Sequence, residues 1–306
     1  MQRYRTDLAR ESRELAGNDL QGVTQSKEQH GPLLVERIVI ETPEAADRLD
    51  KPQGRYVTID AENLSDREPE VFTALSERIA EELSKLLDGI PEQADMMVIG
   101  LGNRFVTPDA LGPETADRIY VTRHIRTNAP ELAPQGMRAV SAMAPGVLGT
   151  TGMETVEVVK GLVEHAKPAA VICVDALAAR STDRIHRTVQ LSDTGISPGS
   201  GIGNMRDTLN RETLGVPVIA IGIPMVVYAA TIAADTIGMV AQRTGLPDNE
   251  ALRALVDEVV REHFGPMIVT PKDIDLLTED AAEILSNGIN RMLHRAYYEE
   301  IEALLE

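Results

Sequence analysis

The stretch Met96-Met-Val-Ile-Gly-Leu-Gly-Asn-Arg-Phe-Val-Thr-Pro-Asp-Ala-Leu-Gly-Pro113 decides the fold of this chain. It joins an apolar strand to a Gly-Asn turn, and the turn leads to one carboxylate, Asp109. A second apolar run, Ala169–Val174, ends in the same way on Asp175. Ligands of open α/β sheets bind beyond the carboxyl ends of the strands. The two aspartates are therefore predicted to converge on one acid site.

The apolar periodicity around this stretch predicts an α/β protein with a mostly parallel central sheet flanked by helices, with additional N-terminal strands and C-terminal helices. Strands are expected at 33–40, 55–59, 95–100, 169–174 and 216–222, and the first two could pair with each other. Helices are expected at 68–87, 153–165, 227–244, 248–264 and 273–305, the last interrupted near Asn287-Gly288. Residues 1–31 lack an apolar period and are expected to form a loosely packed arm, although Thr6–Glu11 could open a short helix.

Composition excludes several classes of protein. A length of 306 residues suits one elaborated domain as well as two. The net charge of -18 should repel nucleic acid and anionic membranes. No apolar run approaches the roughly 18 residues of a membrane span, and no signal peptide is visible. The single Cys173 excludes an intrachain disulfide, so a reducing cytoplasm is the expected compartment.

Each aspartate also has an ordinary structural interpretation. Asp109 could cap the helix that follows it, and Asp175 could cap a helix at 176–180, because Asp is a favoured N-cap residue. The pair is more informative than either member. Two facing carboxylates cannot both ionise cheaply, so one keeps a proton and the two can act as acid and base.

Two glycine-rich loops could supply backbone amides to a ligand. The first contains Gly149, Thr150, Thr151 and Gly152, and it could equally be a plain loop capped by Thr151. The second contains Gly199 and Gly201, and it lacks the Lys-Ser/Thr ending of a phosphate-binding loop. The histidines show no zinc-binding spacing and Cys173 is expected in the core, so neither a metal nor a cofactor is predicted.

Several motifs occur in order along the chain: Arg5-Thr-Asp-Leu-Ala9, Leu101-Gly-Asn103, Thr107-Pro-Asp-Ala-Leu-Gly-Pro113, Gly149-Thr-Thr-Gly-Met-Glu154, Val174-Asp-Ala-Leu-Ala-Ala-Arg180, Asp193-Thr-Gly195 and Ser197-Pro-Gly-Ser-Gly-Ile-Gly-Asn204. Together they resemble the germination protease family of endospore-forming bacteria. The fold of that family is similar to that of hydrogenase maturation endopeptidases, a three-layer αβα sandwich, so the resemblance implies this architecture.

The resemblance implies an endopeptidase that begins the degradation of small acid-soluble spore proteins during germination. The family is made as an inactive homotetrameric zymogen in the forespore and acts in the spore core, without contact with nucleic acid or membrane. Its substrates are cut after an acidic residue in a Thr-Glu-Ile/Phe-Ala type of sequence, to which Thr6-Asp7-Leu8-Ala9 is similar. Self-cleavage is therefore expected between Asp7 and Leu8, with residues 1–7 as propeptide and 8–306 as a single protease domain.

The resemblance assigns catalysis to Asp109 and Asp175, which would share one proton and activate a water. The metal site of the hydrogenase maturation enzymes also uses a histidine, and Leu191-Ser-Asp-Thr-Gly195 offers none where it should lie. A metal-dependent endopeptidase stays an alternative, which activity lost to a chelator and restored by metal would favour. A second alternative is a non-enzymatic acidic oligomeric binding protein.

Overall fold

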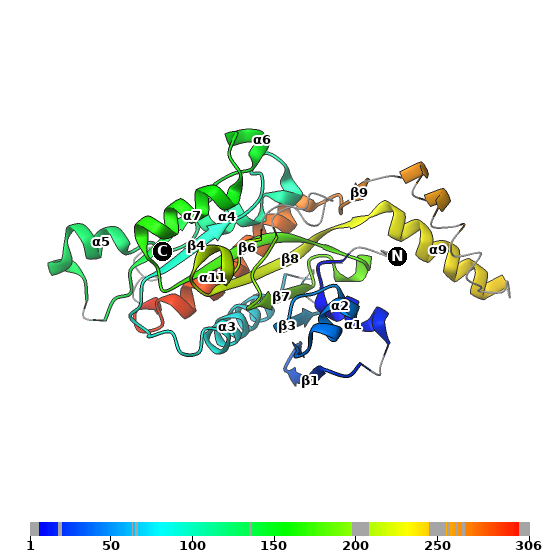
Figure 1. Ribbon diagram of the computed structural model, residues 1–306, viewed down its shortest axis with the longest axis horizontal. Coiled ribbons are helices and arrows are strands. Elements are labelled where there is room, and N and C mark those ends of the chain that lie inside the picture. The colour runs from blue at the N-terminus through cyan, green and yellow to red at the C-terminus, as the bar shows by residue number, and fades with distance from the viewer. Residues whose placement is uncertain are drawn as a thin grey trace.

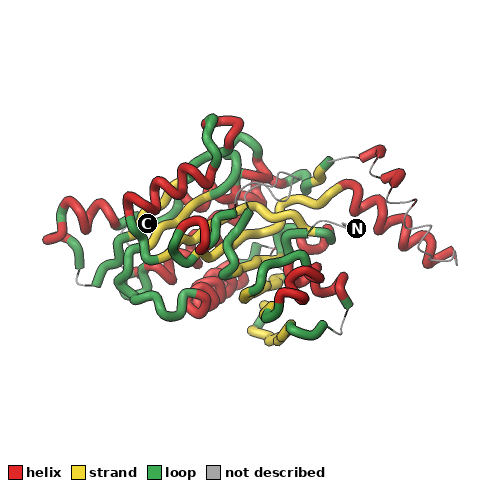
Figure 2. Tube along the Cα trace, in the orientation of Figure 1, coloured by secondary structure: helices red, strands yellow, loops and turns green. Residues whose placement is uncertain are grey.

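The computed structural model describes residues 6–17, 20–62, 64, 67–134, 136–197, 208–244, 255, 258–260, 262–264 and 267–299. Its centre is a mixed β-sheet covered by helices on both faces (Figures 1 and 2). The strands are β1 (Val23–His30), β2 (Leu33–Ile40), β3 (Gly54–Ala61), β4 (Met96–Gly100), β5 (Val140–Met143), β6 (Ala170–Ala179), β7 (Thr188–Ser192), β8 (Val218–Tyr228) and β9 (Ile268–Val269).

The strand order is β1-β2-β3-β7-β8-β6-β4-β5, and β9 pairs with β8. The four strands β5, β4, β6 and β8 are parallel, which confirms the predicted parallel centre. The strands β7, β3, β2 and β1 extend it antiparallel from β8. The expected pairing of the strands at 33–40 and 55–59 is confirmed as β2 with β3.

The helices are α1 (Ala9–Ala16), α2 (Pro43–Leu49), α3 (Pro69–Leu86), α4 (Leu111–Asp117), α5 (Arg123–Asn128), α6 (Leu148–Thr151), α7 (Thr155–Ala166), α8 (Arg211–Leu214), α9 (Ala229–Thr244) and α11 (Ile274–Leu293), with 3-10 turns η2 (Thr107–Asp109), η3 (Pro130–Leu132) and η4 (Thr182–Arg184). The helix α9 projects from one end of the molecule (Figure 1). In the part of the chain that the structure describes, no helix combines the length and hydropathy needed to cross a membrane.

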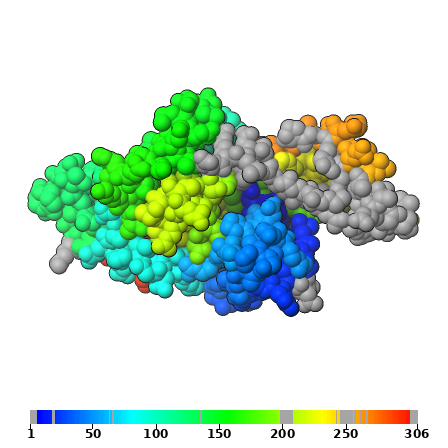
Figure 3. Space-filling model, in the orientation of Figure 1, coloured from blue at the N-terminus to red at the C-terminus, as the bar shows by residue number. Residues whose placement is uncertain are grey.

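Alternation along the strands sorts the core into two layers. In β6, Ala170, Ile172 and Val174 belong to the cluster that includes α3 and α11. Val171 and Cys173 face the other way and pack with Val156, Val159 and Val163 of α7. The helices α1 and α2 cover β2 and β3 through a smaller cluster. Figure 3 shows α7 (green) and the N-terminal elements (blue) on the viewed face.

Several expectations about individual segments are wrong. The strand predicted to end at Val174 continues to Ala179, so Asp175 lies within a strand and caps no helix at 176–180. The helix expected to break near Asn287-Gly288 runs unbroken through α11, because Gly288 packs closely against Ile79 of α3. The predicted helix over 248–264 lies mostly outside the described residues.

The N-terminal arm is the largest correction. Instead of being loosely packed, it forms α1 and β1, and Leu8 and Ala9 are almost completely buried. The short helix that Thr6–Glu11 was expected to open exists as α1. The expectation failed because β1 is exposed on most positions and the apolar side chains that α1 buries are small alanines, which give little apolar signal in the sequence.

Candidate active site

The turn after β4 sets the position of Asp109. The backbone N–H of Leu101 donates to the carbonyl of Val174 (2.8 Å), which ties the end of β4 to β6. Gly102 then adopts φ +113°, and a Cβ there would lie 2.0 Å from the carbonyl oxygen of Asp109. Only glycine fits this position without displacing the aspartate. The Gly-Asn turn of the sequence therefore places Asp109 at the end of β4.

Hydrogen bonding shows that Asp109 is not a helix cap. Its Oδ2 accepts from the backbone N–H of Asn103 (2.8 Å), within the same turn. The following helix, α4, has Ala110 at its N-cap and no side-chain capping bond. The helix itself lies directly on the strand ends, because a Cβ on Gly112 would be 2.6 Å from the carbonyl of Val174. The carboxylate of Asp109 is thus held beside the parallel strands.

Asp175 lies on the neighbouring strand, β6, and points to the same face as Cys173. Its side chain is buried, and its Oδ1 accepts from the backbone N–H of Ala176 (2.9 Å). Burial raises the pKa of Asp175 well above its usual value, and the negative charges of Asp109 and Asp7 raise that pKa further. The two aspartates singled out in the sequence are therefore close enough to repel each other.

The N-terminal segment brings a third carboxylate to the same place. β4 pairs with β6 only as far as Gly100 and Val174. Farther along β6, Asp7 pairs with Ala178: its N–H donates to the Ala178 carbonyl (2.9 Å), and the Ala178 N–H donates to Asp7 Oδ2 (2.7 Å). Residue 7 thus lies along β6 like a short added strand.

The residues after Asp7 cross the face of the sheet. Leu8 is extended and fully buried, in a small cluster with Leu177 and Ala179 of β6 and Val227 of β8. The side chain of Gln190, on β7, donates from Nε2 to the carbonyl of Asp7 (2.8 Å) and accepts at Oε1 from the N–H of Ala9 (2.6 Å). The side-chain amide of Gln190 therefore holds the chain on both sides of Leu8, at the carbonyl of Asp7 and at the N–H of Ala9.

Sequence reasoning did not identify Gln190. The available signal was a polar residue between Val189 and Leu191, which both lie in the core. Alternation turns Gln190 to the opposite face, where it meets the N-terminal segment. That contact joins residues more than 180 positions apart, so spacing along the chain does not reveal it.

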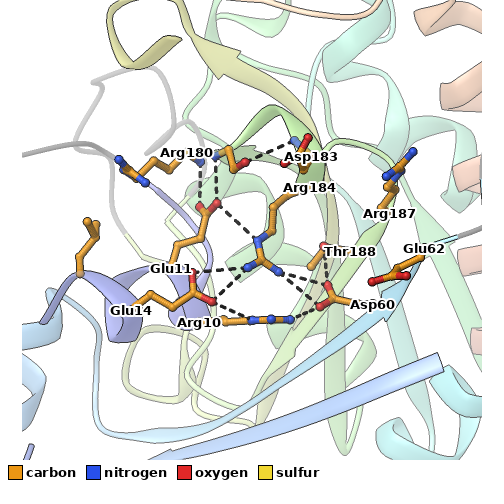
Figure 4. A pocket seen from close by; sticks show the side chains of 12 residues that line it. Arg10, Glu11, Glu14, Asp60, Glu62, Arg180, Asp183, Arg184, Arg187 and Thr188 are labelled. Carbon is orange, nitrogen blue, oxygen red and sulfur yellow. Dashed lines mark hydrogen bonds and ion pairs between the residues drawn. The ribbon is translucent and has the colours of Figure 1, made fainter. Parts of the chain in front are cut away.

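A charged network anchors α1 just after this segment (Figure 4). Glu11, which is only 3% exposed, accepts from the backbone N–H groups of Arg180 (2.7 Å) and Ser181 (3.0 Å) and from the hydroxyl of Thr6. Arg184 pairs with Asp60 of β3 (3.3 Å) and with Glu14 of α1 (3.1 Å). These contacts hold α1 against the sheet through residues that follow position 7.

Of the two glycine-rich loops, only the first lies within the described residues. Gly149, Thr150 and Thr151 lie in α6, and Gly152 ends that helix at φ +73°. Thr151 Oγ1 accepts from the N–H of Met153 (3.2 Å), so the ordinary loop interpretation accounts for this hydroxyl. Gly199 and Gly201 lie outside the described residues. A role of either loop in stabilising an oxyanion remains a prediction.

The remaining candidates for chemistry are the thiol of Cys173 and the metal-binding types of side chain. Cys173 is fully buried, and burial together with the charge of Asp175 raises the pKa of its thiol, as expected of a core residue and not of a nucleophile. Within the described ranges, no group of three or more His, Cys, Asp or Glu side chains has the arrangement of a metal site.

Comparison with known proteins decides the family. The model of the peptidase A25 family, described as germination protease, matches residues 4–250. This chain belongs to the germination protease family. It is 38% identical to the germination protease of Bacillus subtilis (strain 168), with 97% of this chain and 95% of the relative covered. It is 42% identical to that of Caldanaerobacter subterraneus subsp. tengcongensis, with 94% of each covered.

As a member of this family, the chain is a peptidase. Among solved structures, it is similar to a [NiFe] hydrogenase maturation protease, HycI, from Thermococcus kodakarensis KOD1. The two share 19% sequence identity, with 67% of this chain and 98% of the other covered, at a TM-score of 0.32.

Proposed function

We propose that this germination protease is an endopeptidase that begins the degradation of small acid-soluble spore proteins and that matures by cutting its own chain between Asp7 and Leu8. Residues 1–7 are the propeptide and residues 8–306 the protease domain. The enzyme is a homotetramer of the forespore and spore core, made as a zymogen, and it contacts neither nucleic acid nor membrane. Family membership supports the substrate class, and the sequence Thr6-Asp7-Leu8-Ala9 supports the processing site.

One observation carries the proposal: the segment that resembles a substrate lies along β6 beside Asp175. Asp7 pairs with Ala178, three residues after Asp175 on β6, and its charge reaches Asp175. Leu8 fills an apolar pocket of the kind that would accept the Ile or Phe of the substrate pattern. The segment therefore provides both the bond to be cut and the occupant that keeps other polypeptides out of the site.

The difference in burial between the two carboxylates supports a division of roles. Asp175 is buried and its pKa is raised, so it keeps the shared proton and is the general acid. Asp109 is less buried than Asp175 and is held in its turn by the N–H of Asn103, so we assign it the role of general base. This division needs no group beyond the two side chains and a water molecule.

The reaction balances with one water. Asp109 removes a proton from the water as its oxygen attacks the carbonyl carbon of Asp7, while the proton of Asp175 polarises the carbonyl oxygen. The tetrahedral intermediate collapses by breaking the C–N bond to Leu8, and the proton held by Asp109 passes to the leaving nitrogen. The carboxylic acid formed at Asp7 then gives its proton to the amine released at Leu8, so the products are a carboxylate and an ammonium group, and Asp175 regains its proton.

Separate Asp109→Asn and Asp175→Asn variants test the proposal. Each should fold, because Asn keeps the size of Asp, and each should lose self-cleavage and cleavage of small acid-soluble spore protein by about 10³-fold or more. Circular dichroism and thermal unfolding establish the fold, and mass spectrometry locates any cut. Folded variants that still cleave spore protein at the unchanged rate would refute the two-aspartate mechanism.

A further inference from the structure

We infer that Gln190 is the residue that positions the bond to be cut and polarises its carbonyl group. The inference rests on the proposed self-cleavage between Asp7 and Leu8. It adds a third side chain to the two aspartates, contributed by β7, a strand outside the parallel centre of the sheet. This side chain contacts the carbonyl group of the proposed cut directly.

The sheet register places Gln190 opposite the acid. Gly222 of β8 pairs with Asp175 of β6 on one side and with Gln190 of β7 on the other. Residues paired in one row of a sheet point to the same face, so Asp175 and Gln190 face the same layer, about 10 Å apart between Cα atoms. Gly222 has no side chain, and the side chain of Leu177 packs over it, next to Leu8 in the same apolar cluster. Asp7 and Leu8 cross the sheet there.

The contacts of Gln190 fix the orientation of its side-chain amide. Its Nε2 donates to the Asp7 carbonyl at 2.8 Å, and its Oε1 accepts from the Ala9 N–H at 2.6 Å. In the reverse orientation, Oε1 would face the carbonyl oxygen of Asp7 and Nε2 would face the N–H of Ala9. Only the observed orientation of the amide therefore forms both hydrogen bonds. The side chain is also buried, at 8% exposure, where an amide without partners is costly.

These two contacts have different consequences for the reaction. The hydrogen bond to Ala9 holds the chain beyond the cut and fixes its register. The hydrogen bond to the Asp7 carbonyl becomes stronger as negative charge develops on that oxygen in the transition state. A neutral amide does this without adding a charge that would alter the pKa of Asp175. Gln190 therefore supplies a second donor to the oxyanion, in addition to the proton of Asp175.

The test measures first-order self-cleavage of the full chain in Gln190→Met and Gln190→Glu variants. Met keeps the length of the side chain and removes both hydrogen bonds, so self-cleavage should slow by about 10²–10³-fold. Glu keeps an acceptor for Ala9 but donates only when protonated. The ratio of the Glu variant's rate to the Met variant's rate should therefore rise as the pH falls, because protonation restores the donor to the Asp7 carbonyl and removes the added charge. Ser192→Ala, on the same strand and also buried, is the matched control and should cleave at the unchanged rate.

A second measurement distinguishes the binding of the N-terminal segment from the chemical step of cleavage. In an Asp109→Asn background, which does not cleave, Gln190→Met should speed hydrogen exchange at the Ala9 amide, whereas Ser192→Ala should not. Folded Gln190 variants that cleave within twofold of the unchanged chain, or whose rate ratio does not depend on pH, would overturn the inference alone. An unchanged chain that never cuts between Asp7 and Leu8 would instead overturn the proposed function, and this inference with it.

Discussion

The carboxylate of Asp7 raises the pKa of Asp175, the residue proposed to cut the bond that follows Asp7. The bound segment therefore influences the protonation of the proposed catalytic acid. A raised pKa means that Asp175 keeps its proton to a higher pH while Asp7 is in place. Cleavage and departure of the segment remove one of the two negative charges that act on Asp175, so the zymogen and the mature enzyme should differ in pH dependence.

Replacing Asp7 with Asn should shift the pH profile of self-cleavage. Without the Asp7 charge, Asp175 loses its proton at a lower pH, so the decline in rate on the alkaline side should begin at a lower pH than in the unchanged chain. The measurement is the first-order rate of self-cleavage across a pH series. Asp7→Glu retains the charge and serves as the control, and Asp7→Ala should slow cleavage at this bond because the contact with Ala178 is lost. An Asp7→Ala chain that matured at the same bond and rate would contradict self-recognition of this segment.

Gly102→Ala should slow self-cleavage strongly without unfolding the protein. A Cβ at this position would meet the carbonyl of Asp109 at 2.0 Å and would be strained at φ +113°, so the turn must shift and carry Asp109 with it. A displacement of about 1 Å can cost about 10²-fold in rate, which self-cleavage would report. Gly161→Ala is the matched control, because a Cβ in the middle of α7 meets nothing within 4 Å and should be neutral or stabilising. Equal rates for the two variants would show that the turn does not position the carboxylate.

Much of the fold could be predicted because the parallel strands are buried on both faces and appear in the sequence as continuous apolar runs. The run at 169–174 was such a signal, and its continuation to Ala179 was hidden by Asp175, a charged residue within a strand. β7 was missed for a related reason. Its five residues alternate between the core and the polar face that meets the N-terminal segment, which gives no long apolar run.

The site was predictable as far as local turns determine it. Gly102 and Asn103 predict a tight turn, and ligands of α/β sheets bind at the ends of the strands. The participation of Asp7 and Gln190 depends on α1 docking across the sheet, which is fixed by contacts such as Glu11 with the backbone of Arg180 and Ser181. Those contacts join distant parts of the chain and leave no periodic pattern.

Asp175→Asn should stabilise the protein while it removes activity. The pKa of Asp175 is raised in the folded state from an ordinary value of 3.8, so the folded chain binds this proton more tightly than the unfolded chain does. Stability is therefore lost as the pH rises from about 4 through the folded-state pKa, at about 1.4 kcal/mol for each unit of difference. Asn does not titrate, so the gain in the free energy of unfolding should grow across that range. Urea unfolding at pH 4 and pH 8 measures it, and Asp117→Asn, at an exposed position, should show no such growth.

His186 should make the folded protein less stable as the pH falls, which is the opposite of the pH dependence that Asp175 produces. Its ring is almost completely buried, and burial lowers its pKa from 6.5 to about 4; the charge of Asp273 opposes this effect and that of Arg67 adds to it. The unfolded chain binds a proton here first as the pH falls, so stability is lost between about pH 6.5 and pH 4, by up to about 3 kcal/mol.

A His186→Asn variant tests this dependence. Asn does not titrate and tolerates the left-handed backbone at φ +56°, so the variant should fold, although it loses packing contacts. The free energy of unfolding, measured by urea at pH 7 and pH 5, should fall less on acidification than in the unchanged chain. His124→Asn, at an exposed position, is the control and should keep the original dependence. If the His186 variant lost as much stability as the unchanged chain between these two pH values, protonation of His186 would not be the source of the acid sensitivity.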